Sequence, residues 1–350
     1  MRLIVVLAVL IASGLPSRPA LAQADAAPVV AVPEATPVAP PPAAEPDIAS
    51  LETIVVTGAQ PGPGLWRVSR GSHVLWILGT LSPLPRDMTW LSADVEATIA
   101  GSEVALASPG VDFDADVGFF GRLALLPSLV KVRNNTDDKT LDQVLPPDLY
   151  ARWQDLKAKY IGRSRKVEKW RPLFAAGELY RKALDKQRLT ESGQIGKVVS
   201  KAIKQHGITK VDTHVKVKIE EPRAAIKAFK AEELDDVECL RQVLDRLEAD
   251  LATMTARANA WAVGDVDALR TLPHDSPVRT CFAAIAETRF ARERGIDDLP
   301  ERVEAAWLTA AEAALRDHET SFATLSIGDL LKPDGLLAKL VARGYEVEAP

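Results

Sequence analysis

The sequence predicts an α/β protein in which a central mixed sheet is flanked by helices. A strand-like apolar run over residues 74–78 is followed by a short loop and a helix-like segment. A second strand-like segment, 321–327, lies near the C-terminus and is also followed by a helix-like segment. Most of the chain between them has helical periodicity, with one further run of period two. A sheet covered by helices accounts for this order.

Residues 1–22 have the three parts of a secretory signal peptide. Arg2 supplies a positive charge, Leu3–Ala12 is an unbroken apolar run, and Ala20-Leu21-Ala22 is an A-x-A cleavage site. The apolar run is shorter than the roughly 20 residues that a membrane-spanning helix needs. We therefore expect export with cleavage after Ala22, a periplasmic or secreted location, and no transmembrane helix.

The residues that follow the cleavage site form two short segments ahead of the globular domain. Residues 23–50 are rich in Ala, Pro and Val. Such a segment cannot bury enough apolar surface to offset its ordering entropy, so it is predicted to be a disordered tether. Residues 51–63 begin with the β-prone stretch L-E-T-I-V-V-T-G and are predicted to be a linker with an edge strand. The globular domain is expected over residues 64–350.

Composition excludes one class of partner and suggests a covalent cross-link. The net charge of −5 argues against a nucleic-acid partner, because phosphate binding needs concentrated positive charge. The two cysteines, Cys239 and Cys281, do not have the C-x-x-C spacing of a metal site. In an exported chain such a pair favours a disulfide. The bridge requires their Cα atoms to lie within about 7 Å of each other.

The first half of the domain is predicted to begin with a hairpin. Residues 65–69 and 73–78 form its strands, around the turn Arg70-Gly71-Ser72. A helix over 91–100 and a strand over 103–107 follow. From there to Lys210 the pattern is largely helical, with breaks expected at four prolines: Pro127, Pro146, Pro147 and Pro172.

A strand is predicted over Val211–Ile219, because apolar residues occupy every second position. His214 lies on the opposite face of this strand, together with Lys216 and Lys218. We therefore interpret His214 as an exposed strand histidine rather than a ligand.

The clearest helix is predicted over 235–261, where apolar residues recur at steps of three and four. This pattern is compatible with a helix packed inside the chain or with the seam of a dimer. We favour packing inside the chain, so a monomer is expected. The remaining elements are a helix over 299–317, a strand over 321–327, a helix over 335–342 and a strand over 345–347.

Three motifs resemble one protein family. Gly79–Pro85 reads G-T-L-S-P-L-P, Thr140–Pro146 reads T-L-D-Q-V-L-P, and Leu340–Val347 reads L-V-A-R-G-Y-E-V. They are similar to the G-T-x-H-x-L-P loop, the T-L-x-x-V-L-P motif and the closing segment of the TraB/GumN family. That family is related to the Tiki metalloproteases and, more distantly, to the erythromycin esterases. The resemblance implies a periplasmic α/β protein of two related halves, each with a strand–loop–helix motif, and a cleft where the motifs meet.

The resemblance also implies that the residues expected to bind the family's metal are replaced. Two motif histidines and a strand-end glutamate of the family correspond to Ser82, Asp329 and Ser108, respectively. An open catalytic metal site needs three protein ligands, and here Asp329 is the one strong ligand left. The family-type divalent metal is therefore expected to be lost, and no cofactor is expected. The three positions should lie close together.

Further residues are candidates for the same cleft by resemblance. Gly79 and Thr80 belong to the first motif, and Arg302 matches an arginine on the helix ahead of the second motif. Glu220 and Glu221 lie near the family's L-E-T segment and could help to build an oxygen-only site for Mg²⁺ or Ca²⁺. Acidic residues at a strand end are more commonly solvated, or act as charges at a helix N-terminus.

Two functions are therefore considered. The first is a catalytically degenerate family member, a pseudoenzyme that binds a peptide, a glycan or a protein partner at the cell envelope. The alternative is a metal-dependent hydrolase, protease-like or esterase-like, with a rearranged oxygen-rich site. A serine hydrolase is disfavoured, because no histidine lies in a recognisable triad context. The replacements at Ser82, Ser108 and Asp329 favour the pseudoenzyme.

Overall fold

The computed structural model describes one unit of the chain. It covers residues 59–60, 62, 64–115, 117–191, 193–232, 234, 236–249, 251–272, 281 and 284–350. The predicted signal peptide, the tether and most of the linker lie outside these residues. Over the described ranges, no helix combines the length and the apolar character that a membrane span requires.

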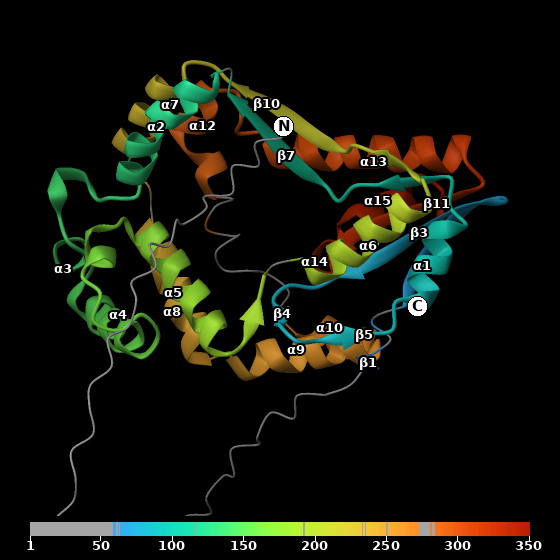
Figure 1. The fold of residues 1–350 in the computed structure, drawn as a ribbon, viewed down its shortest axis with the longest axis horizontal. Helices are drawn as coiled ribbons and strands as arrows, with labels where there is room; N and C mark the ends of the chain where they lie inside the picture. Colours follow the sequence, from blue (N-terminus) through green and yellow to red (C-terminus); the bar gives the residue numbers. More distant parts are fainter. Residues whose placement is uncertain are drawn as a thin grey trace, which may run out of the picture. The chain divides into compact units, whose positions relative to one another are not determined.

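A six-stranded mixed sheet forms the centre of this unit, in the order β12-β2-β3-β11-β6-β9 (Figure 1). The neighbours β3, β11, β6 and β9 run parallel, whereas β2 is antiparallel to both β3 and β12. The strands are β2 (Leu65–Arg70), β3 (His73–Thr80), β6 (Val104–Leu106), β9 (Thr209–Val211), β11 (Thr320–Ser326) and β12 (Glu346–Glu348). The predicted fold class, a mixed sheet flanked by helices, is confirmed.

The predicted hairpin is formed by β2 and β3. Arg70 pairs with His73, which leaves Gly71 and Ser72 as a two-residue turn. Gly71 has a φ of +63°, as the first central residue of such a turn requires, and a glycine adopts this conformation without strain. On its other side β3 pairs in parallel with β11, so the two strands that carry the predicted motifs are neighbours in the sheet.

Helices cover both faces of the sheet. The connection from β3 through α1 (Ala93–Ala100) to β6 runs across the sheet in one direction, and the return through α13 (Leu299–Asp317) to β11 runs in the other. Right-handed crossovers therefore place α1 and α13 on opposite faces. Helix α6 (Gln194–Gln205) packs beside α1, and α15 (Leu336–Ala342) packs beside α13. Trp66, Trp307 and Phe322 are fully buried in the core between these layers.

Strand β11 is held at its start by Glu103. The carboxylate of Glu103 accepts hydrogen bonds from the backbone N–H of Glu319, at 2.8 Å, and from the imidazole Nδ1 of His318, at 3.0 Å. These bonds stabilise the charged carboxylate, and the pKa of Glu103 is lowered, with the His318 bond as the main cause. The contacts of Glu103 with His318 and Glu319 therefore hold the start of β11 next to the start of β6.

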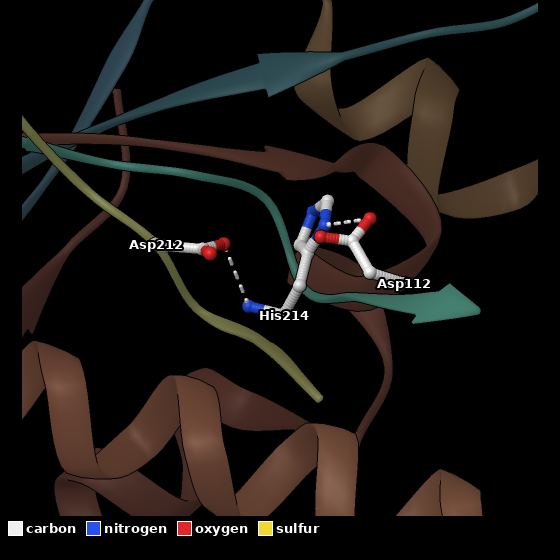
Figure 2. Close-up of side chains that lie close together, drawn as sticks. All are labelled: Asp112, Asp212 and His214. Carbon is white, nitrogen blue, oxygen red and sulfur yellow. Dashed lines mark hydrogen bonds and ion pairs between the residues drawn. The ribbon is translucent and has the colours of Figure 1, made fainter. Parts of the chain in front are cut away.

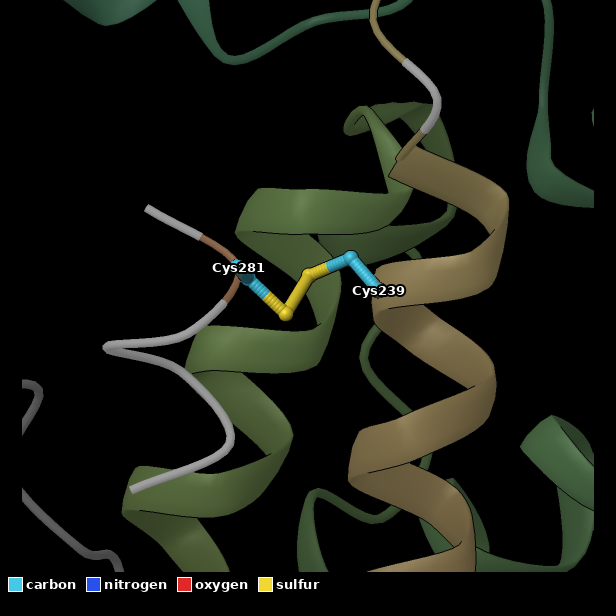
Figure 3. The surroundings of a disulfide bond; sticks show 2 residues. All are labelled: Cys239 and Cys281. Carbon is cyan, nitrogen blue, oxygen red and sulfur yellow. A yellow bond between two sulfur atoms is a disulfide. The ribbon is translucent and has the colours of Figure 1, made fainter. Parts of the chain in front are cut away.

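A second core is built mainly by helices. It gathers α3 (Leu141–Val144), α4 (Pro147–Tyr160), α5 (Pro172–Lys186) and α8 (Asp236–Ala249) around buried apolar side chains. Cys239 on α8 and Cys281 form a disulfide with a Cα–Cα distance of 5.3 Å, within this core (Figure 3). The predicted bridge is confirmed.

The longest predicted helix consists of two helices. Helix α8 ends at Ala249, and α9 (Leu251–Val263) follows; Asp250 lies outside the described residues. The steps of three and four continue through both helices, so periodicity alone did not reveal the division. Leu244 and Leu247 are buried in the second core of the same chain, as packing inside the chain predicts. The oligomeric state stays a prediction.

Two further expectations from the sequence were wrong. Pro127 lies inside α2 (Phe119–Val132) rather than ending a helix: the ring removes one backbone hydrogen bond, yet the helix continues past it. The predicted strand Val211–Ile219 is interrupted: β9 ends at Val211, and β10 (His214–Ile219) pairs separately with β7 (Gly110–Ala115), a strand that was not predicted.

The remaining strands and α-helices of the described residues connect these layers. They are β1 (Ala59–Gln60), β4 (Leu84–Pro85), β5 (Thr89–Trp90), β8 (Leu189–Thr190), α7 (Pro222–Ala231), α10 (Val266–Thr271), α12 (Arg289–Glu293) and α14 (Ile327–Leu331). Strand β1 pairs in parallel with β5, and β4 pairs antiparallel with β8.

Candidate functional site

A cavity of about 800 Å³ opens where the parallel strands β3, β11, β6 and β9 end. The carboxyl ends of parallel strands are the usual place for a ligand in an open α/β sheet. The cavity is bordered by the loop after β3, the loop after β6, one side of α6, and α14. Its volume falls within the roughly 300–1,000 Å³ that is typical of ligand pockets.

The three positions singled out from the sequence all line this cavity. Ser82 lies in the loop after β3, Ser108 follows β6, and Asp329 lies in α14, directly after β11. They come from three neighbouring parallel strands, so the sheet brings together residues that are far apart in the chain. Thr80, the last residue of β3, also lines the cavity.

Gly79 lies behind the cavity wall, where the two motifs touch. A Cβ atom at Gly79 would come within 2.5 Å of Ile327 Cδ1 and 2.8 Å of the Trp66 ring. The first motif therefore needs a glycine here to pack against the start of α14. This contact couples the end of β3 to the end of β11.

The hydroxyl groups of the cavity wall bond to one another and to the strand ends. Ser108 Oγ lies 2.7 Å from Thr324 Oγ1, across the β6–β11 pair. Thr80 Oγ1 donates to the carbonyl oxygen of Leu325 at 3.1 Å. The hydroxyl of Ser108 therefore has a local partner at the position where the family places a carboxylate.

Asp329 forms hydrogen bonds with Ser326 at the start of α14. Ser326 is the N-cap residue: its Oγ accepts a hydrogen bond from the backbone N–H of Asp329 at 3.0 Å. The same hydroxyl donates to Asp329 Oδ2 at 2.6 Å. This reciprocal arrangement stabilises a helix N-terminus, as capping by serine commonly does.

The donors at these three positions do not fit a divalent transition metal. Two are neutral serine hydroxyls, which are weak ligands beside imidazole, carboxylate and thiolate. The third, Asp329, is engaged by its own cap. An open metal site has three strong protein ligands, and these positions offer one.

Helix α9 supports the loop that carries Ser82. The indole Nε1 of Trp261 donates to the carbonyl oxygen of Gly79 at 3.1 Å, and Arg257 Nη2 donates to the carbonyl oxygen of Ser82 at 3.1 Å. Both side chains are buried. Helix α9 therefore holds the loop after β3 in place through two hydrogen bonds. The sequence had predicted only that this helix packs in the core.

A β-bulge shapes the other side of the cavity. Leu106 pairs with Val211, and pairing resumes with Gly110 opposite His214. Ala107, Ser108 and Pro109 thus stand opposite Asp212 and Thr213, which is the extra residue that defines a bulge. Thr213 Oγ1 lies 3.0 Å from the carbonyl oxygens of both Ala107 and Ser108 and holds the bulge in place.

His214 lies at the cavity, directly after this bulge, and the sequence-based interpretation of it as exposed was wrong. Its imidazole lines the cavity and is half-buried. The Nδ1 atom lies 3.1 Å from Asp112 Oδ1, and the backbone N–H donates to Asp212 Oδ1 at 3.2 Å (Figure 2). The strand face was predicted correctly. Gly110 on the unpredicted strand β7 leaves room for the ring, and the sequence contained no signal of that pairing.

Three other cleft candidates do not line the cavity. Glu220 and Glu221 follow β10 and are exposed, and Glu221 is the N-cap residue of α7. Arg302 is on the surface of α13, where Nη1 donates to the carbonyl oxygen of Gly295 at 3.2 Å and to Asp298 Oδ1 at 3.3 Å. These three residues therefore lie at helix ends or on the surface.

Comparison with known proteins gives one match. The model of the TraB/PrgY/gumN family matches residues 64–349. No curated protein and no solved structure matches the chain.

Proposed function

Because the chain belongs to the TraB/PrgY/gumN family, we propose that it is an exported, catalytically degenerate member that binds a ligand in the cavity at the ends of β3, β11 and β6. The ligand class is a peptide, a glycan or a protein partner at the cell envelope. The observation that carries the proposal is that Ser82, Ser108 and Asp329 line one cavity without providing a set of metal ligands.

The lining of the cavity favours a peptide segment within this class. Apolar side chains of α6, among them Ile195, Val199 and Ile203, border one side. Hydroxyl groups at the strand ends border the other. The described lining residues include no Phe, Tyr or Trp, whose flat rings commonly stack on a sugar ring. A mixture of aliphatic and hydroxyl groups suits the side chains and backbone of a peptide.

The disulfide supports export. Structural disulfides form and persist in oxidising compartments such as the periplasm and the extracellular space, and they are rare in the cytosol. The Cys239–Cys281 bridge in the second core is therefore expected of an exported chain. Together with the predicted signal peptide, it supports an envelope location.

The alternative, a metal-dependent hydrolase whose ligands are Asp329, Glu220 and Glu221, has less support. Neither glutamate lines the cavity that contains Asp329. The carboxylate of Asp329 is also bonded to Ser326. An oxygen-rich site at these residues would require both glutamates to leave their positions after β10.

Filling the cavity is expected to abolish peptide binding. Peptides selected from a displayed random library on the mature protein should bind the wild type and lose at least about tenfold in affinity for Ser82→Trp, since each 1.4 kcal/mol corresponds to a factor of ten. Ser82 is exposed, so a large side chain there blocks the cavity without disturbing the core. Ser72→Trp on the exposed β2–β3 turn is the matched control and should bind as the wild type does. Equal binding by all three proteins would contradict a ligand site in the cavity.

Restoring the family's ligand types is expected to create a metal site. The variant Ser82→His/Ser108→Glu/Asp329→His should bind one more equivalent of Zn²⁺ than the wild type, because strong ligands would then meet in one cavity. Titration calorimetry and metal analysis measure the difference. The matched control Ser82→Ala/Ser108→Ala/Asp329→Asn should keep the metal content of the wild type. Loss of bound metal in that control would show that the wild-type residues do hold a metal and would overturn the degenerate assignment.

A further inference from the structure

We propose that Asp112, Asp212 and His214 form a binding site for one divalent transition-metal ion at the edge of the cavity, separate from the three replaced family positions. The three residues come from β7, from the bulge and from the start of β10 (Figure 2). Each offers one ligand atom, and these atoms all lie within 4.8 Å of one another. The inference does not depend on what the cavity binds.

The spacing of the ligand atoms matches a small metal ion. Zinc lies about 2.0–2.2 Å from imidazole nitrogen and carboxylate oxygen, so two ligands at tetrahedral angles are about 3.4 Å apart. His214 Nδ1 and Asp112 Oδ1 are 3.1 Å apart. The other pairs of ligand atoms lie within 4.8 Å, so rotation of the carboxylates is needed to complete the site.

The backbone holds the three residues in place before any ion binds. Gly110 pairs with His214, so Asp112 lies two residues further along the neighbouring strand, on the same face. Asp212 is fixed by the hydrogen bond that its carboxylate accepts from the backbone N–H of His214, at 3.2 Å. Such preorganisation lowers the cost of ordering the ligands when an ion arrives.

Gly110 sets the orientation of the imidazole. A Cβ atom at Gly110 would lie 2.8 Å from His214 Nε2, so the Nε2 edge of the ring rests against the glycine backbone. Nδ1 is the nitrogen next to the carboxylate of Asp112. The ring therefore presents to the carboxylates the nitrogen that would bind the ion.

Charge and exposure favour a cation at this place. Two carboxylates face one imidazole, and the side chains of Asp112, Asp212 and His214 are 32–41% exposed, which leaves a path for the ion. The Lys216 ammonium group lies 3.7 Å from Asp212 Oδ2, but its side chain is 76% exposed and can swing into solvent. The imidazole favours Zn²⁺ over Ca²⁺ and Mg²⁺, which prefer ligand sets made of oxygen alone.

An ion held here would border the cavity, because His214 is one of its lining residues. Three protein ligands leave at least one coordination position open. A carbonyl or carboxylate oxygen of a molecule in the cavity could occupy that position. The ion would then act as a binding contact.

The test is titration of the mature, untagged chain with Zn²⁺ by calorimetry, after treatment with EDTA and dialysis. One equivalent should bind to the wild type, and Asp112→Asn and His214→Gln should each weaken binding at least tenfold. His318→Gln is the matched control. His318 also pairs with a carboxylate, that of Glu103, at 3.0 Å, but among the described residues it belongs to no group of three possible metal ligands. It should bind Zn²⁺ as the wild type does. Circular dichroism verifies that each variant is folded.

Two results would overturn the site: no Zn²⁺ binding by the wild type, or equal loss in His318→Gln and His214→Gln. The variant Gly110→Ala gives a second measurement, since its methyl group would displace the ring and should weaken Zn²⁺ binding. Zn²⁺ binding that persists in Ser82→Ala/Ser108→Ala/Asp329→Asn but disappears in His214→Gln supports this site and leaves the degenerate assignment intact. Zn²⁺ binding that persists in His214→Gln but disappears in Ser82→Ala/Ser108→Ala/Asp329→Asn would overturn both this site and the degenerate assignment.

Discussion

Replacing Trp261 with alanine is expected to destabilise the protein by about 3–5 kcal/mol, the usual cost of removing a fully buried tryptophan side chain. Trp261 is 0% exposed and packs edge-to-face on Trp90, with ring centroids 5.8 Å apart. Its indole also bonds to the carbonyl oxygen of Gly79. The variant therefore loses packing in the main core and the support of the first loop at once.

Trp261→Phe separates these two contributions. The phenyl ring retains much of the apolar contact but leaves the carbonyl of Gly79 without its indole partner, which costs about 1–3 kcal/mol when the group stays buried. Urea denaturation followed by circular dichroism measures both variants. We expect the order wild type, Trp261→Phe, Trp261→Ala in falling stability. A Trp261→Ala variant within about 1 kcal/mol of the wild type would contradict the described packing.

Removing the disulfide is expected to cost about 4 kcal/mol, on the chain-entropy estimate for a loop of this length. The bridge joins residues that are 42 positions apart, so it restricts a long segment of the unfolded chain. Cys239→Ser/Cys281→Ser is the variant, and urea unfolding with and without dithiothreitol is the measurement. A reductant should lower the stability of the wild type to that of the variant.

The reductant provides its own control. It should leave the stability of Cys239→Ser/Cys281→Ser unchanged, because that variant has no bridge to break. If dithiothreitol shifts the wild type and the variant equally, the effect does not come from the disulfide. If it shifts neither, the two thiols are not bonded in the folded protein.

The regular elements were predictable where local patterns are complete. The hairpin was found because a glycine separates two strand-like runs, and α13 was found with its observed ends, Leu299–Asp317, because its apolar positions recur with helical period. Strand β7, G-V-D-F-D-A, was missed although its apolar and acidic residues alternate as in a half-buried strand, because the whole region up to Lys210 was interpreted as largely helical. Its partner, β10, lies about a hundred residues later, and no local pattern reports such a pairing.

The candidate site was predictable in one part only. Ser82, Ser108 and Asp329 were found through resemblance to family motifs, and hydrophobic periodicity alone would not have placed them together. His214 was assigned to the right strand face but not to its surroundings, because its neighbours Gly110 and Asp112 belong to the missed strand. Glu220 and Glu221 were candidates because they lie near the family's L-E-T segment in the sequence, and nearness in the sequence carries no information about the direction of a side chain.

The bulge between the paired strands has a consequence for how this protein can change over generations. Ser108 and Asp212 lie where the ladder between the two strands is interrupted, so their side chains are not tied to a sheet register. Drift at these positions can therefore alter the chemistry next to the cavity while Val104–Leu106 and Thr209–Val211 remain paired. The gap therefore separates the residues that set the chemistry beside the cavity from the residues that hold the two strands together.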